Sequence, residues 1–409
     1  MKVVISTGMG PLHFIESVGC IANGSFEISI ILGWIARRTD TALVRLLSRL
    51  SGRDLSAGLR RRQIRPVGYS ILSRPIPEFV FQAVNIVSGR FTFLKWVLQE
   101  FAWSFYGWYT RSCFKGADIV HIRSGAGQGG AIRYARKRGA KIIVDQSALH
   151  PCTCIENTGA DYSRWEMPPL ITPGKGVWVN VEKDCREADM ILVNADQIKS
   201  SFVENGYDSS KIRVAYLGVR TDFIGLKKTY RSDGPLRILY TGGFSILKGA
   251  EYFLSAIRQL MKDRVSVEVT VIGTVDLPRE LIRQYADLPI KYCGRIPQDE
   301  LKGYLQTSDI YLFPSLADGC AKSGMEAMAA GLCVVATKES GLPIVDGESA
   351  LIIRRSNAAD IVERIKYLNV NRSEIERIGA NACKLVATSY TWSAYGEKVR
   401  GYYKELLNA

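Results

Sequence analysis

The sequence predicts an α/β protein of two doubly wound domains, each a parallel sheet with helices on both faces. Three observations support this fold class. The chain has 409 residues, which is beyond the size at which a single hydrophobic core usually divides. Short β-branched runs alternate with segments of helical period, as in a parallel sheet with crossover helices. The alternation occurs in two series, which a polar stretch rich in turn residues separates.

The first series predicts an N-terminal domain over residues 1–218. Its apolar runs suit strands that are buried on both faces, because they are apolar throughout rather than alternating. They span residues 3–6, 27–32, 118–122, 141–145, 190–194 and 212–217. The segments between them, such as 129–140 and 195–207, have helical spacing and end near a glycine.

A linker is predicted over residues 219–235, and the second series predicts a C-terminal domain over residues 236–389. Its apolar runs span residues 236–243, 267–273, 290–294, 309–314 and 333–337. Residues 390–409 have the apolar spacing of an amphipathic helix. We expect this helix to close the chain by packing back on the N-terminal domain.

The net charge of +14 is unevenly placed. Residues 1–150 contain 21 Lys and Arg against 8 Asp and Glu, whereas the remaining residues contain 33 against 32. The segment from Arg37 to Arg65 is the densest. Such a basic face indicates contact with an anionic surface, either lipid head groups or nucleic acid. The alternative is a solvated face that only keeps the protein soluble.

The segment 79–114 is unusually aromatic and contains Trp96, Trp103 and Trp108. Charged residues interrupt it, which argues against a membrane span. We expect most of these rings to be core and the others to form an apolar rim at a membrane interface.

Neither a secretory leader nor an apolar stretch of about 18 residues is evident, which favours a cytoplasmic protein. Nine cysteines are scattered except for Cys152 and Cys154, whose spacing is too tight for the usual zinc pair. We therefore expect reduced thiols, no structural metal and no cofactor.

The motif TGGFSILKG, residues 241–249, follows a predicted strand and precedes a predicted helix. Ligands bind at this place in doubly wound sheets, and free amides at a helix start together with Lys248 favour a phosphate. The motif is not a Walker loop, because no Ser or Thr follows the lysine. Alternatively, Gly242 and Gly243 are turn formers and Lys248 is solvated.

The motif ADGCAKSGMEAMAAG, residues 317–331, also has two interpretations, one as a helix cap and one as a ligand site. Ser323 and Glu326 have the spacing of a capping box, and Gly331 would end the helix. Capping does not explain the small residues from Gly319 to Gly324, whose amides would face a diphosphate. Asp318 and Glu326 would then accept hydrogen bonds from hydroxyls on either side.

Residues 313–353 resemble the signature region of GT-B glycosyltransferases of glycosyltransferase family 4, which are retaining enzymes with nucleotide-sugar donors. The resemblance extends to residues 188–219, 239–249 and 390–395. It implies two Rossmann-like domains that face each other across a cleft, and a hexosyl or related transferase activity of class 2.4.

By this resemblance Lys248 binds the donor diphosphate, Glu326 the ribose hydroxyls and Asp318 the hydroxyls of the transferred sugar. Residues 293–297 resemble the segment that contacts the nucleobase. The implied donor-binding residues are Gly243, Lys248, Arg295, Gly319, Cys320, Ala321, Lys322, Ser323 and Glu326. The implied catalytic residues are Asp318 and His150, and the implied acceptor-binding residues are Gly8, Gly10 and His13.

Two positions depart from the family pattern. Many members have an arginine five residues before the lysine, where this chain has Gly243, so a second phosphate cation would come from Arg295 or Lys322. The first acid is usually a glutamate, and Asp318 is one methylene shorter. Both changes bear on the choice of donor.

The sequence thus predicts a retaining transferase that uses a lipid-linked saccharide acceptor in bacterial polysaccharide biosynthesis, at the inner face of the membrane. The basic N-terminal domain would contact anionic lipid. If it does not, a soluble acceptor is the alternative. A GT-B-like nucleotide-sugar epimerase is an alternative, although it would need more cleft histidines than this chain offers. A nucleic-acid-binding protein is another alternative, but no recognised module accompanies the arginines.

Overall fold

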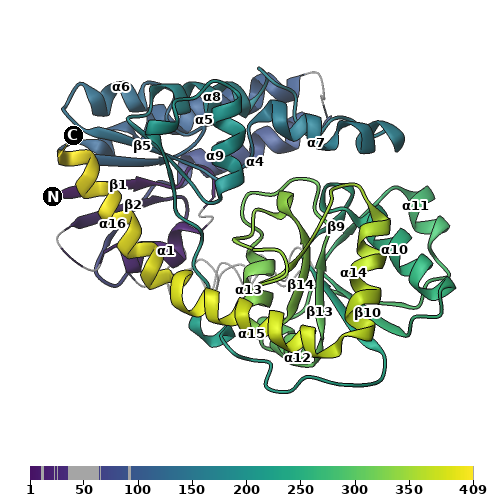
Figure 1. Cartoon of the computed structure of the whole chain (residues 1–409). Coiled ribbons are helices and arrows are strands. Elements are labelled where there is room, and N and C mark those ends of the chain that lie inside the picture. The colour runs from purple at the N-terminus through teal and green to yellow at the C-terminus, as the bar shows by residue number, and fades with distance from the viewer. Residues whose placement is uncertain are drawn as a thin grey trace, which may run out of the picture.

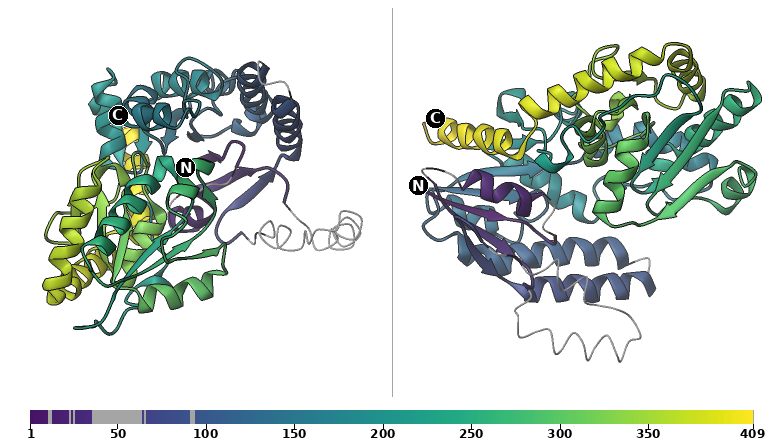
Figure 2. Two further views of the ribbon diagram at one scale, coloured as in Figure 1. Left: turned by 90° about the vertical axis from the view of Figure 1, so that its right-hand side faces the viewer. Right: turned by 90° about the horizontal axis from the view of Figure 1, so that it is seen from below.

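The computed structural model describes residues 1–10, 13–22, 24, 26–35, 64, 66–90 and 94–408. The basic segment from Arg37 to Arg65 therefore lies, except for Ile64, outside the described residues. The chain forms two α/β domains, with both termini on the N-terminal one (Figure 1). Figure 2 shows the same arrangement from two other sides.

The N-terminal domain has a seven-stranded parallel sheet in the order β3-β2-β1-β4-β5-β6-β7. Its strands are β1 Lys2–Ser6, β2 Glu27–Leu32, β3 Ser70–Ser73, β4 Ile119–Arg123, β5 Lys141–Gln146, β6 Met190–Val193 and β7 Ile212–Val214. Its described residues form the helices α1 Phe14–Ile21, α4 Pro75–Arg90, α5 Lys95–Thr110, α6 Ala131–Arg136, α7 Pro151–Arg164, α8 Val177–Glu187 and α9 Asp196–Glu204.

The C-terminal domain has a six-stranded parallel sheet in the order β12-β10-β8-β13-β14-β15. Its strands are β8 Leu236–Thr241, β10 Val267–Ile272, β12 Ile290–Gly294, β13 Ile310–Phe313, β14 Cys333–Thr337 and β15 Leu351–Ile353, and a small pair joins β9 Phe244–Ser245 to β11 Val275–Asp276. Its helices are α10 Ala250–Lys262, α11 Arg279–Gln284, α12 Gln298–Thr307, α13 Lys322–Ala330, α14 Ala358–Val370 and α15 Arg372–Ser389, after which α16 Trp392–Asn408 closes the chain.

The two doubly wound parallel sheets confirm the predicted fold class. Each apolar run of the sequence contains a strand, because central strands of both sheets are buried on both faces. The runs miss β3, a half-exposed edge strand with serines at both ends, and the short strands β9, β11 and β15. The run at 212–217 is strand only to Val214.

The polar stretch between the two series lies against the C-terminal domain. The Gly225 and Lys227 amides donate to the carbonyl oxygens of Ala329 and Ala330 at the end of α13. Lys227 Nζ lies 3.2 Å from Asp309 Oδ1, and both side chains are buried. This stretch therefore packs as part of the C-terminal core rather than as an exposed tether.

The closing helix α16 crosses from the C-terminal domain and packs against α1 (Figure 1). Its Tyr403 hydroxyl lies 2.7 Å from His121 Nδ1, and its Tyr395 hydroxyl lies 3.4 Å from His13 Nε2. Gly396 faces the α1 backbone so closely that an added Cβ would lie 2.5 Å from the Cys20 carbonyl oxygen.

Both histidines also contact the buried carboxylate of Asp145 at the end of β5. Its Oδ2 lies 3.3 Å from Nε2 of His13 and 3.3 Å from Nε2 of His121. Burial alone would raise the pKa of Asp145, but the two histidines hold that pKa well below its usual range. The network thus ties β4, β5, α1 and α16 together.

No helix among the described residues is both long and apolar enough to cross a membrane.

We predict opposite effects of alanine at two glycines of α16. Gly396→Ala should lower the free energy of unfolding by about 1–3 kcal/mol, because the new methyl group overpacks against the Cys20 carbonyl. Gly401→Ala should raise it by about 0.5–1 kcal/mol, because an added Cβ meets no atom within 4 Å and alanine favours the helix. Urea unfolding measures both, and equal effects would contradict the close packing of α16 on α1.

Candidate active site

A pocket of about 360 Å³ lies between the two domains, at the carboxyl ends of the strands. The C-terminal domain contributes residues 247–248 after β8 and residues 317–319 after β13. The N-terminal domain contributes residues 147–149 after β5, together with side chains from α7, α8 and the segment between them. This is the place at which doubly wound sheets bind ligands.

Lys248 and Asp318 meet in this pocket, although the chain separates them by 70 residues. Lys248 Nζ lies 2.6 Å from Asp318 Oδ2, and each side chain is 21% exposed. Asp318 Oδ1 accepts a hydrogen bond of 2.8 Å from the Gly319 amide. Gly249 follows the lysine in the left-handed conformation, and any Cβ there would overlap the Pro314 carbonyl. Gly249 therefore lets the loop after β8 approach the loop after β13, which places Lys248 beside Asp318.

The predicted capping box is wrong. Helix α13 begins at Lys322, and no side chain caps its N-terminus. Ser323 lies inside the first turn, where its hydroxyl meets the Tyr311 hydroxyl of β13 at 2.8 Å instead of a backbone amide. The predicted end of the helix is confirmed, since Gly331 adopts the left-handed conformation.

The predicted row of free amides is confirmed only in part. The Gly319 amide donates to Asp318 and the Ala321 amide donates to the Ser340 carbonyl. Within the described part of the chain, the Ser323 and Gly324 amides in the first turn of α13 donate to no other group. The helix start therefore offers an anion fewer amides than the sequence suggests, but these still point along the positive end of the helix dipole.

The Glu326 carboxylate has no polar partner among the described residues. Among the described residues no group donates a hydrogen bond to it or forms an ion pair with it. Burial raises the pKa of Glu326 to about 7, with Lys322 lowering it and Glu16 raising it. Its oxygens are thus available to the hydroxyls of a ligand.

Lys322 and Arg295, the two predicted substitutes for the missing family arginine, lie in different surroundings. Lys322 Nζ lies 2.7 and 2.5 Å from the two carboxylate oxygens of Glu16 in α1, so it bridges the domains. Arg295 is exposed, and no described residue pairs with it. At Gly243 an added Cβ would meet only Thr274 Oγ1, at 3.8 Å, so the position itself is uncrowded.

The small residues after Asp318 bring the domains into contact. A Cβ at Gly319 would overlap the Ser147 carbonyl oxygen of the N-terminal domain. Cys320 and Ala321 are buried, and burial raises the pKa of the Cys320 thiol to about 12. Gly319 needs to be a glycine because the Ser147 backbone approaches it.

His150 occupies a structural position. Its ring caps α7, with Nδ1 accepting a hydrogen bond of 3.4 Å from the Cys152 amide, and its edge packs on Phe202 and Tyr207. Burial lowers the pKa of His150, and Arg186 lowers it further. The residues just before His150 line the interdomain pocket, but His150 itself does not.

The predicted acceptor loop borders a second pocket of about 360 Å³ in the N-terminal domain. Gly8 and Gly10 line this pocket, whereas His13 is buried against Asp145. Arg123 supports the loop, because its Nη1 donates to the Gly10 carbonyl at 3.3 Å and its guanidinium lies 5.2 Å from the Trp103 ring centroid. Pro11 and Leu12, between Gly10 and His13, lie outside the described residues.

Sequence reasoning missed Glu16, Asp145 and Arg123. For Asp145 and Arg123 a signal existed, because Arg123 is the last and Asp145 the last but one residue of an apolar strand, where parallel strands present ligands or fix loops. For Glu16 no local signal existed, because its partner lies 306 residues away.

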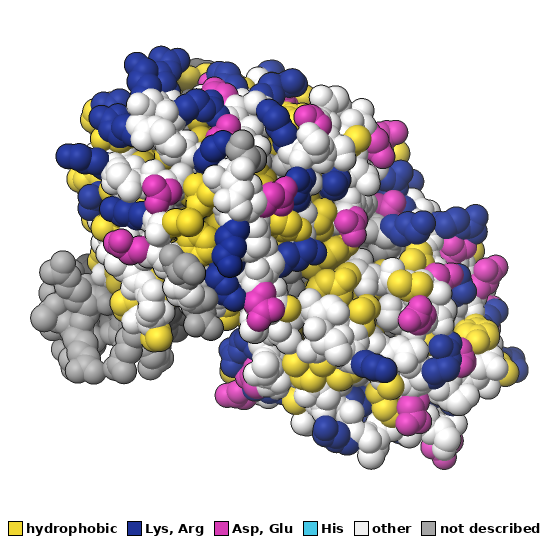
Figure 3. Space-filling model, turned by 60° about the vertical axis from the view of Figure 1, so that its left-hand side comes forward, with side chains coloured by type: hydrophobic (Ala, Val, Ile, Leu, Met, Phe, Trp, Pro, Cys, Tyr) yellow, Lys and Arg dark blue, Asp and Glu magenta, His cyan; other side chains and the backbone are white. Residues whose placement is uncertain are grey.

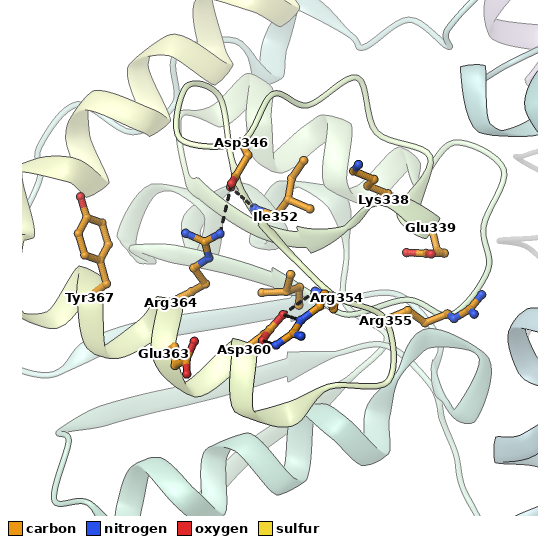
Figure 4. A pocket seen from close by; sticks show the side chains of 11 residues that line it. Lys338, Glu339, Asp346, Ile352, Arg354, Arg355, Asp360, Glu363, Arg364 and Tyr367 are labelled. Carbon is orange, nitrogen blue, oxygen red and sulfur yellow. Dashed lines mark hydrogen bonds and ion pairs between the residues drawn. The ribbon is translucent and has the colours of Figure 1, made fainter.

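A larger pocket of about 800 Å³ lies between β15 and α14, and none of the predicted site residues lines it (Figure 4). Two of its arginines pair with two of its aspartates. Arg354 Nε lies 2.7 Å from Asp360 Oδ2, and Arg364 Nη2 lies 3.2 Å from Asp346 Oδ2. The pocket is therefore a solvated groove rather than the candidate site.

Within the described ranges, no three His, Cys, Asp or Glu side chains are grouped so as to hold a metal ion. The expectation of a metal-free, cofactor-free protein stays a prediction.

Comparison of the structure identifies the fold. The crystal structure of Anabaena Alr3699/HepE in complex with UDP superposes with a TM-score of 0.63 at 12% identity, over 99% of this chain and 100% of that one. The sucrose-phosphate synthase of Thermosynechococcus elongatus has a TM-score of 0.66 at 14% identity, over 100% and 99% of the two chains. The predicted GT-B fold of two Rossmann-like domains is thereby confirmed.

Comparison of the sequence finds one family match and several named relatives, each over part of the chain. Residues 235–371 match the family described as glycosyl transferases group 1. The amylovoran biosynthesis glycosyltransferase AmsK of Erwinia amylovora is 35% identical over 148 residues, which are 34% of this chain and 36% of AmsK. The putative colanic acid biosynthesis glycosyltransferase WcaL of Salmonella typhimurium is 25% identical over 254 residues, 59% of this chain and 61% of WcaL. The chain thus matches less than two thirds of either relative. Both are named glycosyltransferases, consistent with the predicted enzyme class.

We predict that Gly319→Ala separates the domains, because its Cβ has no room beside the Ser147 carbonyl. Small-angle X-ray scattering should show a larger radius of gyration than in the wild type. Gly303→Ala in α12 is the matched control, since its Cβ meets no atom within 4 Å. Indistinguishable scattering of the two variants would mean that Gly319 does not set the interdomain contact.

Proposed function

We propose that this chain is a retaining glycosyltransferase of family 4, which moves a sugar from a nucleotide-sugar donor to a saccharide acceptor. The observation that carries the proposal is the arrangement around α13. Lys248 and Asp318 face the interdomain pocket on one side of the helix start, and the unpartnered Glu326 lies one turn inside the helix. This arrangement lies within the segment that matches glycosyl transferases group 1.

The donor diphosphate would replace the internal pairing of this site. Lys248 exchanges part of its contact with Asp318 for a phosphate oxygen, and the free amides of the first turn of α13 add donors. Glu326 accepts hydrogen bonds from the ribose hydroxyls, and Asp318 accepts them from the transferred sugar. The UDP in the HepE crystal structure supports a nucleotide donor on this fold.

Preorganised charge would then promote departure of the nucleoside diphosphate. Lys248 and the helix start stabilise the negative charge that develops on the leaving phosphate. Among the described residues that line the pocket, Asp318 already contacts Lys248 and burial raises the pKa of the Cys154 thiol to about 11, which favours transfer without a covalent enzyme intermediate. The acceptor oxygen therefore bonds to the anomeric carbon on the face that the phosphate leaves, and its proton passes to the departing phosphate oxygen.

The acceptor would bind at the N-terminal pocket beside Gly8 and Gly10. We infer a lipid-linked saccharide in bacterial polysaccharide biosynthesis, since AmsK and WcaL are named for amylovoran and colanic acid biosynthesis. The protein would work in the cytoplasm, at the inner face of the membrane, with no metal. Lys and Arg side chains spread over the N-terminal domain on the face drawn in Figure 3 support contact with anionic lipid.

The first test measures donor binding. Nucleotide sugars, UDP-glucose among them, should raise the melting temperature of the wild type through linkage between binding and folding. Lys248→Met should abolish the shift, whereas Lys262→Met on the exposed face of α10 should keep it. A full shift in the Lys248 variant, or no shift with any nucleotide sugar, would overturn the proposal.

The second test uses the raised pKa of Glu326. The carboxylate accepts ribose hydrogen bonds in its ionised form, and the protonated form dominates below pH 7. In the wild type kcat/KM for the donor should therefore fall about tenfold per pH unit below about 7 and level off above it. Glu326→Gln should lower kcat/KM at pH 8 and remove this acid limb. An unchanged limb in the glutamine variant would assign it to another group.

A further inference from the structure

The helices α4 and α5 form a hairpin at one edge of the N-terminal domain, where they lie side by side (Figure 2). Large hydrophobic side chains project from it into solvent. On α4 these are Ile76, Phe79, Ile86 and Val87. On α5 they are Val97, Phe101 and Trp108.

The exposed side chains of α5 share one face, because positions 97, 101 and 108 follow the helical repeat. The opposite face packs on the domain and buries Trp103, Tyr106 and Thr110. A Cβ at Gly107 would overlap the Gln128 carbonyl, so no gap allows the helix to rotate. The apolar face is therefore fixed outward.

Aromatic rings form a continuous ladder along this face. The ring centroid of Phe105 lies 6.1 Å from that of Phe101 and 5.7 Å from that of Trp108. A cation borders the ladder, with Arg111 Cζ 5.7 Å from the Trp108 centroid, and at the start of α5 Lys95 Nζ lies 5.1 Å from the centroid of Trp96. Apolar rings edged by cations are typical of surfaces at the boundary of lipid head groups and acyl chains.

Charge favours a lipid bilayer as the occupant of this surface. The hairpin contains only two acids, Glu78 and Glu100. Glu78 accepts a hydrogen bond of 2.8 Å from the Trp34 amide, and neither acid is fully exposed. Residues 1–150 carry 21 Lys and Arg against 8 Asp and Glu, whereas the rest of the chain is almost balanced. Anionic head groups therefore attract the N-terminal domain and have little net attraction for the C-terminal domain.

We propose that the outer face of the α4–α5 hairpin docks the N-terminal domain on an anionic lipid bilayer. This proposal names the surface that makes the membrane contact of the proposed function. Docking itself does not require sugar transfer. Glu78 and Gln82 of α4 also line the N-terminal pocket beside Gly8. A docked hairpin thus places that pocket next to the bilayer, from which a lipid-carried acceptor would enter.

Flotation with vesicles tests the proposal. The full chain should float with vesicles of phosphatidylcholine mixed with phosphatidylglycerol, and less with phosphatidylcholine alone or at high salt. The double variant Val97→Asp with Phe101→Asp should lose at least about tenfold of the bound fraction, because two charges would enter the acyl boundary. The matched control is Ile282→Asp with Val370→Asp, which changes two exposed hydrophobic residues of the C-terminal domain and should float like the wild type.

Equal melting temperatures of the three proteins would show that the substitutions leave the fold intact, as expected for exposed positions. The proposal is overturned when the hairpin variant floats like the wild type, or when the wild type ignores anionic vesicles. It is also overturned when light scattering shows a dimer that only the hairpin variant loses, since the surface would then bind a second copy of the chain. The melting shift with nucleotide sugars, which needs no lipid, reports separately on the proposed function.

Discussion

The buried carboxylate of Asp145 is the constraint on which the arrangement of the cleft depends. A charge with 4% exposure is tolerated only when it is paired, and its partners here are His13 and His121. Those histidines in turn contact Tyr395 and Tyr403 of the closing helix. The need to satisfy one ion therefore fixes the relative positions of two strands, α1 and the last helix of the chain.

This constraint reaches the cleft through α1. The helix begins directly after His13, and its first turn carries Glu16 to Lys322 at the start of α13. Backbone contact at Gly319 and Ser147 joins the domains on the other side of the same loop. The ion pair is half exposed and contributes little stability by itself, so we regard it as a positioning contact. The closing helix α16 thus helps to position Lys322 at the start of α13 through α1, although α16 itself does not contact Lys322.

The two acids of the motif at residues 317–331 have different surroundings, and this difference gives the site its chemistry. Lys248 and the Gly319 amide hold the Asp318 carboxylate in place, where it can accept hydrogen bonds from a sugar while Lys248 also contacts a phosphate. Glu326 receives no hydrogen bond from any described residue, and burial raises its pKa to about 7. Carboxylates in unequal environments take unequal tasks, here a fixed counterion and a titrating acceptor.

The sequence by itself determined the two parallel sheets, because strands buried on both faces must be apolar throughout, and it determined the two motifs that flank the pocket. It did not determine β3, whose serines lack that signal, or the role of Ser323, whose hydroxyl is taken by Tyr311 from another element. Likewise the His150 cap, the Asp145 network and the bridge from Glu16 to Lys322 appear only in the tertiary structure. The physical reason is that hydrogen bonds and charges are satisfied by whatever lies nearest in space, and spacing along a chain does not specify partners hundreds of residues away.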